Sequence, residues 1–408
     1  MKIYLVGGAV RDKLLKIDSD DRDWVVVGST PEEMMKQGFT PVGKDFPVFL
    51  HPTTQEEHAL ARTEKKTGSG YTGFECYFSE EVTLEEDLRR RDLTINAMAL
   101  DESGMVIDPY GGQRDLEHKR LRHVSEAFSE DPLRVLRVAR FAAKLAHLGF
   151  RVAEETMQLM SHITESGELE HLTAERVWLE WHKSLTTPSP HIFFNVLRDC
   201  GALAVLLPEL NNLFGVPQPE KWHPEIDTGI HTLMVLKQAA QLSPCPQIRF
   251  AATVHDLGKG ITPQNEWPSH KKHCHNGLAL INQVCDRFKL PNDYRELALI
   301  VCEQHSNVHR AMELRSDTFV RIFAKIDVWR KPERLNALLT CCHADHTGRK
   351  GSEMKPYPQK AIFEQAYAAA AAVNAQDVIA LGFKGKEIRE QLDKLRAHQI
   401  KMELNLTH

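Results

Sequence analysis

Short apolar runs alternate with polar, capped segments over the first hundred or so residues. Lys2–Val6 and Asp23–Val27 are apolar, largely β-branched runs that each end at glycine, which predicts strands. A helix is expected over residues 9–15, and Thr30 followed by Pro31 predicts another helix start. Further strands are expected at residues 48–50, 58–62 and 105–107, and a helix capped by Thr83 is expected to continue to residue 100. This alternation predicts a small α/β domain.

From residue 129 onward the apolar spacing becomes helical almost throughout. Helices are expected over residues 129–148, 172–185, 192–200, 366–372 and 384–396, and proline-rich breaks at residues 187–190 and 208–224 separate groups of them. The sequence therefore predicts an α/β head followed by all-α regions. We expect four parts, at residues 1–128, 129–222, 223–350 and 351–408.

Composition narrows the class of protein. No apolar run approaches the roughly 20 residues that cross a bilayer, and the N-terminal apolar stretch is broken at once by glycines and Arg11. We therefore expect no membrane partner. The 8 cysteines form no CxxC pair, so we expect neither a zinc ribbon nor a disulfide framework, and a reducing cytoplasm fits best. The net charge of −5 means that a nucleic acid would be held by local basic clusters.

A glycine turn and a carboxylate pair carry the first candidate chemistry. Gly8 lies where the first strand meets a helix, so backbone N–H groups and Arg11 could contact a phosphate, although such a turn can equally be purely structural. Asp21 and Asp23 alternate along an extended segment and project to one face. Paired carboxylates suit Mg²⁺ in a phosphoryl transfer, and a solvated acidic loop is the alternative.

Arginines provide the complementary charge. Arg89, Arg90 and Arg91 are expected at a helix start beside Asp92, where a triphosphate would be favoured. Further on, basic and acidic residues recur every third position and form a slanted stripe on the expected helix, which could read a base edge or could be an ordinary salt-bridged face. The residues of this stripe are Asp131, Arg134, Arg137 and Arg140.

Five motifs in order resemble the bacterial CCA-adding enzymes and their poly(A) polymerase relatives, members of the DNA polymerase β superfamily. The motifs are LVGGAVRD with DxDWVVVG, DLRRRDLTINAMA from Asp87, DPYGGxxDL from Asp108, EDPLRVLRVARF from Glu130 and AERVW from Ala174. The resemblance implies a polymerase β-like nucleotidyltransferase head, a helical neck, CTP and ATP as substrates and tRNA as partner. It implies catalysis by Asp21 and Asp23 with Mg²⁺, with Glu57 as a candidate third carboxylate. The nucleotide would be bound by Gly8, Arg11, Arg91, Asp92, Arg137 and Arg140, and its base read by Glu130, Asp131 and Arg134.

A histidine-rich region carries a second pattern. His231, the pair His255–Asp256 and Asp345 follow the order H…HD…D, which resembles the HD superfamily of metal-dependent phosphohydrolases. Imidazole and carboxylate ligands together suit nickel, cobalt or manganese. His273 and His305 match positions that hold a second metal in some HD enzymes, and Asp327 is a rival to Asp345 as the fourth ligand.

The resemblance therefore implies CCA addition to tRNA without a nucleic-acid template, plus phosphatase and 2′,3′-cyclic phosphodiesterase activity on RNA ends. Within the family, the alternative is a poly(A) polymerase, which usually carries a basic C-terminal extension and no HD domain. An RNA-binding protein with a decayed active site is the alternative from another class. The sequence leaves a monomer and a homodimer equally open.

Overall fold

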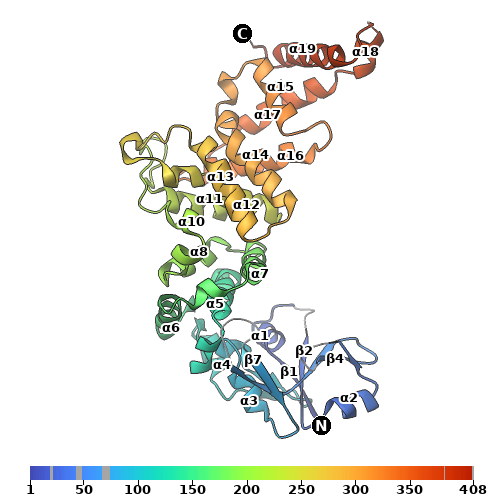
Figure 1. Cartoon of the computed structure of the whole chain (residues 1–408), viewed down its shortest axis with the longest axis vertical. Helices are drawn as coiled ribbons and strands as arrows, with labels where there is room; N and C mark the ends of the chain where they lie inside the picture. The colour runs from blue at the N-terminus through green and yellow to red at the C-terminus, as the bar shows by residue number, and fades with distance from the viewer. Residues whose placement is uncertain (19–21, 43–47, 67–73, 381, 407–408) are drawn as a thin grey trace. The chain divides into compact units, whose positions relative to one another are not determined.

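The computed structural model describes residues 1–18, 22–42, 48–66, 74–380 and 382–406. The chain divides into two compact units, Met1–Leu206 and Leu207–His408. The strands belong to the first unit, blue to green in Figure 1, and the second unit is built from helices over its described residues. The expected order of an α/β head followed by all-α regions is confirmed. The four-part division is finer than these two units and stays a prediction.

A mixed sheet forms the head and contains seven strands over the described residues. The two strands expected from the first apolar runs lie side by side at its centre, antiparallel, with Val6 opposite Asp23. The second of them pairs in parallel with a strand that begins at Glu57, so Glu57 is the neighbour of Asp23. In sheet order the strands are β3 (Thr40–Pro41), β4 (Val48–Leu50), β5 (Glu57–Leu60), β2 (Asp23–Val27), β1 (Lys2–Val6), β8 (Ala99–Leu100) and β9 (Val106–Ile107).

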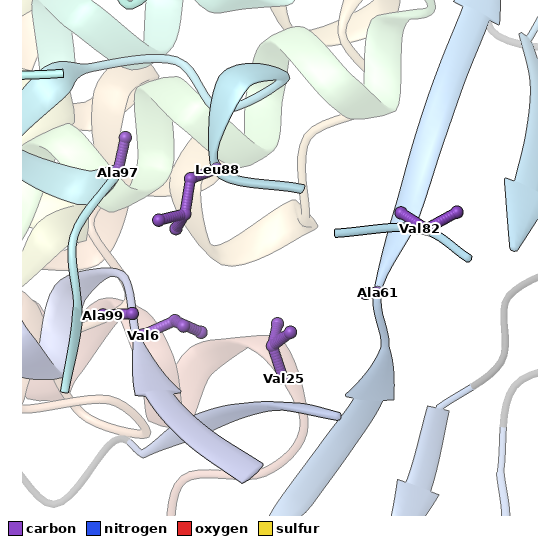
Figure 2. Close-up of a cluster of buried hydrophobic side chains, with 7 residues drawn as sticks. All are labelled: Val6, Val25, Ala61, Val82, Leu88, Ala97 and Ala99. Atoms are coloured by element: carbon purple, nitrogen blue, oxygen red, sulfur yellow. The ribbon is translucent and has the colours of Figure 1, made fainter. Parts of the chain in front are cut away.

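A buried apolar cluster fixes the sheet against the segments that carry the functional residues. Figure 2 shows Val6 of β1 and Val25 of β2 on the side of the sheet that faces Leu88, with Ala99 beside Val6. Leu88 is fully buried, so the helix that carries it cannot move away from the sheet without exposing apolar surface. The cluster comprises Val6, Val25, Ala61, Val82, Leu88, Ala97 and Ala99.

Short elements complete the head. The N-cap Thr30 accepts a hydrogen bond from the Glu33 amide, and Thr83 with Glu86 forms a capping box, as their sequences predict. The helices are α1 (Gly8–Leu14), α2 (Pro31–Lys36), α3 (Leu84–Arg89) and α4 (Gly112–Glu117). A hairpin of β6 (Arg62–Lys66) and β7 (Phe74–Phe78) and a small pair of β10 (Arg120–Leu121) and β11 (Arg151–Val152) accompany them.

The expected helix up to residue 100 is wrong. Helix α3 ends at Arg89, and the chain continues through a 3-10 turn, η2 (Thr94–Asn96), into β8. Arg90 and Arg91 donate hydrogen bonds to the buried carboxylate of Asp87. Beyond them, the Thr94 amide donates to the carbonyl of Arg122 instead of to its own helix. The three arginines therefore lie at the end of a helix and not at a start, so the expected attraction of a helix N-terminus does not act there.

The rest of the first unit is helical. Helix α5 (Leu133–Leu145) buries one face against its neighbours α7 and α8, as its amphipathic sequence predicts. It follows the 3-10 turn η3 (Glu126–Glu130), so the expected continuous helix from residue 129 is interrupted at Pro132. The other elements are η4 (Ala146–Leu148), α6 (Glu154–Glu165), η5 (Glu168–His171), α7 (Ala174–Leu185), α8 (His191–Asp199) and α9 (Ala202–Leu206).

The second unit is built around four packed helices, α11, α12, α14 and α16. None of the described helices of the chain is long and apolar enough to cross a bilayer. These four helices are α11 (Thr228–Leu242), α12 (Pro246–Val254), α14 (Asn292–His309) and α16 (Glu333–Thr347), and α13 (His273–Arg287) packs against α14. They are joined by α10 (Pro208–Asn211), η6 (Leu257–Ile261), η7 (Gln264–Glu266), η8 (Ala311–Glu313) and α15 (Ser316–Lys325), and followed by α17 (Pro358–Ala371), α18 (Ala375–Ala380) and α19 (Lys386–Glu403).

Candidate active sites

A strongly basic cavity of about 680 Å³ opens in the first unit between the sheet and helix α5. Ten basic and five acidic side chains line it, although the whole chain carries a net charge of −5. A polyanion would therefore be attracted to this cavity much more strongly than to the average surface. Of the residues singled out from sequence, Gly8, Arg11, Asp23, Glu57, Arg91, Asp92, Asp131, Arg134, Arg137 and Arg140 line it.

Two carboxylates on neighbouring strands, those of Asp23 and Glu57, line the cavity. Asp23 begins β2 and Glu57 begins the adjacent parallel strand, so the two are paired in register. Both are exposed and line the cavity. Asp21 lies outside the described residues. Oxygen ligands of this kind fit Mg²⁺.

The glycine turn at the end of β1 brings the backbone against the arginines. Gly7 has a φ of 70°, and a Cβ there would lie 3.0 Å from Nη1 of Arg91. Arg11, in the first turns of α1, is almost completely buried. Its guanidinium pairs with Asp12 at 2.7 Å and donates to the side-chain oxygen of Asn96 at 2.6 Å. Arg11 is thus held rigidly at the cavity wall.

Buried aspartates orient the second group of arginines. Asp87 pairs with Arg90 at 2.7 Å and with Arg91 at 3.1 Å, and Asp92 pairs with Arg137 at 2.7 Å. Burial alone would raise the pKa of Asp92, but Arg137 and the hydrogen bond from Asn96 outweigh it and hold this pKa far below its ordinary value. Asp92 is therefore ionised and fixes Arg137.

The expected stripe is only partly helical: Arg134, Arg137 and Arg140 lie on α5, whereas Asp131 precedes the helix in an extended conformation. Arg134 donates to the carbonyls of Ala127 and Arg90 at 2.7 and 2.6 Å. Asp131 pairs with Arg176 of α7 at 2.9 Å, and Arg140 pairs with Glu180 at 2.5 Å. These contacts fix side chains that can present donors and an acceptor to a base edge. Glu130 lies in η3 and is not among the cavity-lining residues.

In the second unit, the four residues of the expected HD site converge. Nε2 of His231 lies 3.0 Å from Oδ1 of Asp345, and Nε2 of His255 lies 3.3 Å from Oδ2 of Asp256 and 3.9 Å from Oδ2 of Asp345. All four are at least 96% buried. The rival Asp327 pairs with Arg330 at 2.6 Å instead, and its side chain is partly exposed. The structure thus places Asp345, and not Asp327, beside the histidines.

Close backbone approach makes this convergence possible. Gly258 follows the His–Asp pair in η6, and a Cβ there would lie 2.0 Å from the carbonyl oxygen of His273. Only glycine lets η6 and α13 pack so closely. Nε2 of His273 consequently lies 3.4 Å from Oδ1 of Asp256, and Nε2 of His305 lies 3.6 Å from the same oxygen.

The donor set of this site fits a transition metal. Nε2 of His255 and Oδ1 of Asp256 are buried without a hydrogen-bond partner. Burial alone would raise the pKa of Asp256, but Lys259 and His255 hold it well below its ordinary value. Burial alone would lower the pKa of His255, but Asp256 raises it, whereas burial lowers the pKa of the neighbouring His305 to about 3. Ionised carboxylates and neutral imidazoles are the forms that bind a metal.

Sequence reasoning missed the residues that orient this site. Nδ1 of His231 lies 3.0 Å from the carboxylate of Glu225, and Asp345 accepts from Nε2 of His309 at 2.6 Å. The phenol of Tyr357 lies 3.0 Å from Nδ1 of His309. A carboxylate six residues before His231 in a histidine-rich stretch was a usable signal for Glu225. Tyr357 offered none, because only the fold brings it there.

Three parts of the chain match known protein families. Residues 3–122 match the family described as "Poly A polymerase head domain", and residues 149–214 match "Probable RNA and SrmB-binding site of polymerase A". Residues 228–349 match the HD domain family. The first and last of these ranges contain the head carboxylates and the four HD residues.

Similar proteins cover the whole chain. The multifunctional CCA protein of Vibrio campbellii is 69% identical over 404 residues, covering 99% of this chain and 100% of the relative. That of Vibrio parahaemolyticus is 68% identical over 405 residues, with the same coverage. A Thermotoga maritima CCA-adding enzyme solved in complex with tRNA is 20% identical, covering 100% of this chain and 88% of that one with a TM-score of 0.64, which indicates the same fold.

Proposed function

The chain belongs to the family of multifunctional CCA proteins, and from this premise we propose that it rebuilds the 3′-terminal CCA of tRNA. It adds two cytidines and one adenosine from CTP and ATP without a nucleic-acid template. Its HD domain removes phosphates from RNA ends as a phosphatase and 2′,3′-cyclic phosphodiesterase. The protein is thus a transferase with an appended hydrolase.

One observation carries the transferase assignment. Asp23, Glu57 and the arginines fixed by buried aspartates line a single cavity of about 680 Å³. Carboxylates and guanidiniums that line the same cavity supply the two kinds of charge that a nucleoside triphosphate in transfer requires. An ordinary salt-bridged surface would not gather these residues around an open space.

The chain's own groups position the reacting atoms. The 3′-hydroxyl oxygen of the RNA forms a bond to the α-phosphorus of the nucleotide, and the bond to pyrophosphate breaks. We assign triphosphate binding to Arg11, Arg91, Arg137 and Arg140 and to the backbone at Gly8, because their orientation is fixed before substrate arrives. Asp21 and Asp23, with Glu57 as the candidate third carboxylate, would hold Mg²⁺, which when bound neutralises charge on the attacking and leaving oxygens.

Base selection is assigned to the segment that leads into α5. Asp131 supplies an acceptor and Arg134 supplies donors, and Arg176 keeps Asp131 in place. The Watson–Crick edges of cytosine and adenine both present an amino donor beside a ring acceptor, so the same two side chains can serve both bases. The family resemblance also assigns base reading to Glu130. This residue is not among those that line the cavity, so it would have to contact the base from beyond the cavity lining.

The HD site supplies the hydrolase. A water oxygen forms a bond to phosphorus, and the bond from phosphorus to the RNA oxygen breaks. His231, His255, Asp256 and Asp345 would hold a nickel, cobalt or manganese ion, which when bound acidifies the attacking water. We propose that this activity clears blocked tRNA ends, because a terminal phosphate masks the 3′-hydroxyl that the transferase needs.

A cytoplasmic location fits these substrates. The seven described cysteines are all free thiols, as a reducing compartment favours.

Stepwise nucleotide addition tests the proposed function. With tRNA lacking CCA, we expect three additions when CTP and ATP are both present, two with CTP alone, and none with ATP alone. With tRNA ending in CC, ATP should give one addition and then no more. A poly(A) polymerase would extend either tRNA with ATP alone and would not stop after one residue. That result, or no incorporation of either nucleotide, would overturn the proposal.

A further inference from the structure

Arg349 is a largely buried cation beside a carboxylate of the HD site. It follows Asp345 by four residues, and its Nη2 lies 3.5 Å from Oδ1 of Asp345. The same oxygen lies 3.0 Å from Nε2 of His231, so the guanidinium lies beside two of the atoms that would hold a metal ion. The Arg349 side chain is 17% exposed, which leaves part of it within reach of a ligand.

The guanidinium of Arg349 has donors that the protein does not use. Among the described residues, the Arg349 side chain makes no hydrogen bond and only this one ion pair, and its Nε is buried without a partner. Arginine carries five N–H donors in a planar fork, and burying a charged donor without a partner is costly. The unused donors therefore point to an anionic ligand beside the HD site.

The cation on the other carboxylate is held differently. Nζ of Lys259 lies 2.6 Å from Oδ2 of Asp256 and donates to Oε1 of Gln218, also at 2.6 Å. Both contacts are short, so Lys259 is fixed as the counterion of Asp256. Of these two cations, Arg349 is the one whose donors remain available to a ligand.

The charges around the HD site favour an anion once a metal ion is bound. Glu225, Asp256 and Asp345 supply three negative charges, and Lys259 and Arg349 supply two positive ones. With neutral imidazoles, a divalent ion therefore changes the net charge of this group from negative to positive. The two cations also repel that ion. A phosphate that contacts both the metal and the guanidinium would remove this repulsion, because arginine can donate to two phosphate oxygens at once.

We propose that Arg349 binds the phosphate group of the RNA end in the HD site, with its guanidinium donating to phosphate oxygens. The proposal rests on the proposed phosphohydrolase function of the HD domain and adds to it a residue that contacts the substrate. Arg349 has opposite effects on the two ligands of the site. Its charge weakens the binding of the metal ion and strengthens the binding of phosphate.

Binding measurements on the full-length protein test this role without using activity. The protein is stripped of metal by chelation and titrated with Co²⁺, and the loaded protein is then titrated with inorganic phosphate while the visible spectrum of the bound Co²⁺ is followed. Only phosphate that reaches the metal changes this spectrum, so phosphate in the head cavity does not contribute. For Arg349→Gln we expect the Kd of phosphate to rise at least about tenfold and the Kd of Co²⁺ to fall roughly three- to tenfold.

Two further variants serve as controls. Arg349→Lys keeps the charge but not the planar fork, so its affinity for Co²⁺ should match that of the wild type and its affinity for phosphate should be intermediate. Arg330→Gln changes an exposed arginine that pairs with Asp327, and it should alter neither affinity.

A purely structural role of Arg349 would give a different pattern. If Arg349 only oriented Asp345, Arg349→Gln would weaken the binding of Co²⁺ and of phosphate together, and this result would overturn the proposal. A Kd of phosphate within about twofold of wild type in Arg349→Gln would overturn it as well. The proposed function itself fails by another result, namely phosphate release from RNA ends that survives His255→Ala.

Discussion

At the scale of single residues, the arginines of the head cavity depend on buried carboxylates. Sequence spacing identified Arg137 and Asp92 as candidates but could not show that they pair, since they are 45 positions apart. The same holds for Asp131 and Arg176, which are brought together by the packing of α5 on α7. Residue identity was predictable from sequence, whereas pairing was decided by tertiary packing.

The Asp92–Arg137 pair makes head stability depend on pH. Because the pKa of Asp92 is lower in the folded state than in the unfolded state, its ionised form stabilises the fold above the unfolded pKa, and this contribution is lost as pH falls toward the folded pKa. Asp92→Asn should destabilise the head by roughly 1–3 kcal/mol at pH 7 and by less below about pH 4. Hydrogen exchange of head peptides at both pH values measures the difference. A deficit that stays constant or grows in acid would contradict this role.

Base selection should depend on Asp131. Asp131→Ala removes an acceptor for the amino groups of cytosine and adenine, so we expect the preference for CTP over UTP to fall roughly 10- to 100-fold in kcat/KM. Single-nucleotide incorporation with each triphosphate measures it. Glu126→Ala, in the neighbouring 3-10 turn but exposed, serves as the control and should keep the preference. Equal discrimination in both variants would remove Asp131 from base reading.

At the scale of elements, the apolar pattern predicted the strands β1, β2 and β4 to the residue, because short runs of β-branched, aromatic and other apolar residues next to glycine or proline favour strands. It failed between residues 90 and 100. There the local sequence is compatible with a helix, but the hydrogen bond from the Thr94 amide to Arg122 and the pairing of Leu93 with His123 hold the chain in a turn and a strand. Such long-range contacts leave no signal in local periodicity.

The approach of η6 to α13 should be sensitive to one methyl group. A Cβ at Gly258 would collide with the His273 carbonyl at 2.0 Å, so Gly258→Ala should destabilise the second unit by about 1–3 kcal/mol and separate His273 from Asp256. Thermal unfolding and Co²⁺ binding report the two effects. Gly260→Ala is the control. A Cβ at Gly260 would lie 3.2 Å from a Leu213 methyl, so this variant should be destabilised less. Unchanged stability of Gly258→Ala would contradict the prediction and show that the backbone can shift to accommodate the methyl group.

At the scale of the whole molecule, the two compact units predict separable activities. The head cavity lies within the first unit and the HD residues within the second. His255→Ala should therefore abolish phosphate release from 2′- or 3′-phosphorylated RNA while CTP and ATP incorporation stays within about twofold of wild type. Loss of both activities in a variant that remains folded would contradict separate sites.

The sequence also predicted the order of the parts and the four HD residues, because the order of motifs can be read without knowing which residues are in contact. It favoured Asp345 over the rival Asp327 but could not show which of the two lies beside the histidines. The structure favours Asp345, because α16 places Oδ1 of Asp345 3.0 Å from Nε2 of His231.

The most direct test of the transferase assignment is the rate at which Asp23→Ala incorporates CMP into tRNA lacking CCA, measured under single-turnover conditions with Mg²⁺. Asp101→Ala changes a partly exposed aspartate in a head loop that does not line the cavity, and it is the matched control. We predict that the Asp23 variant loses at least about a hundredfold in rate while the control and the phosphate-releasing activity are unchanged. Incorporation at the wild-type rate by Asp23→Ala would contradict the account.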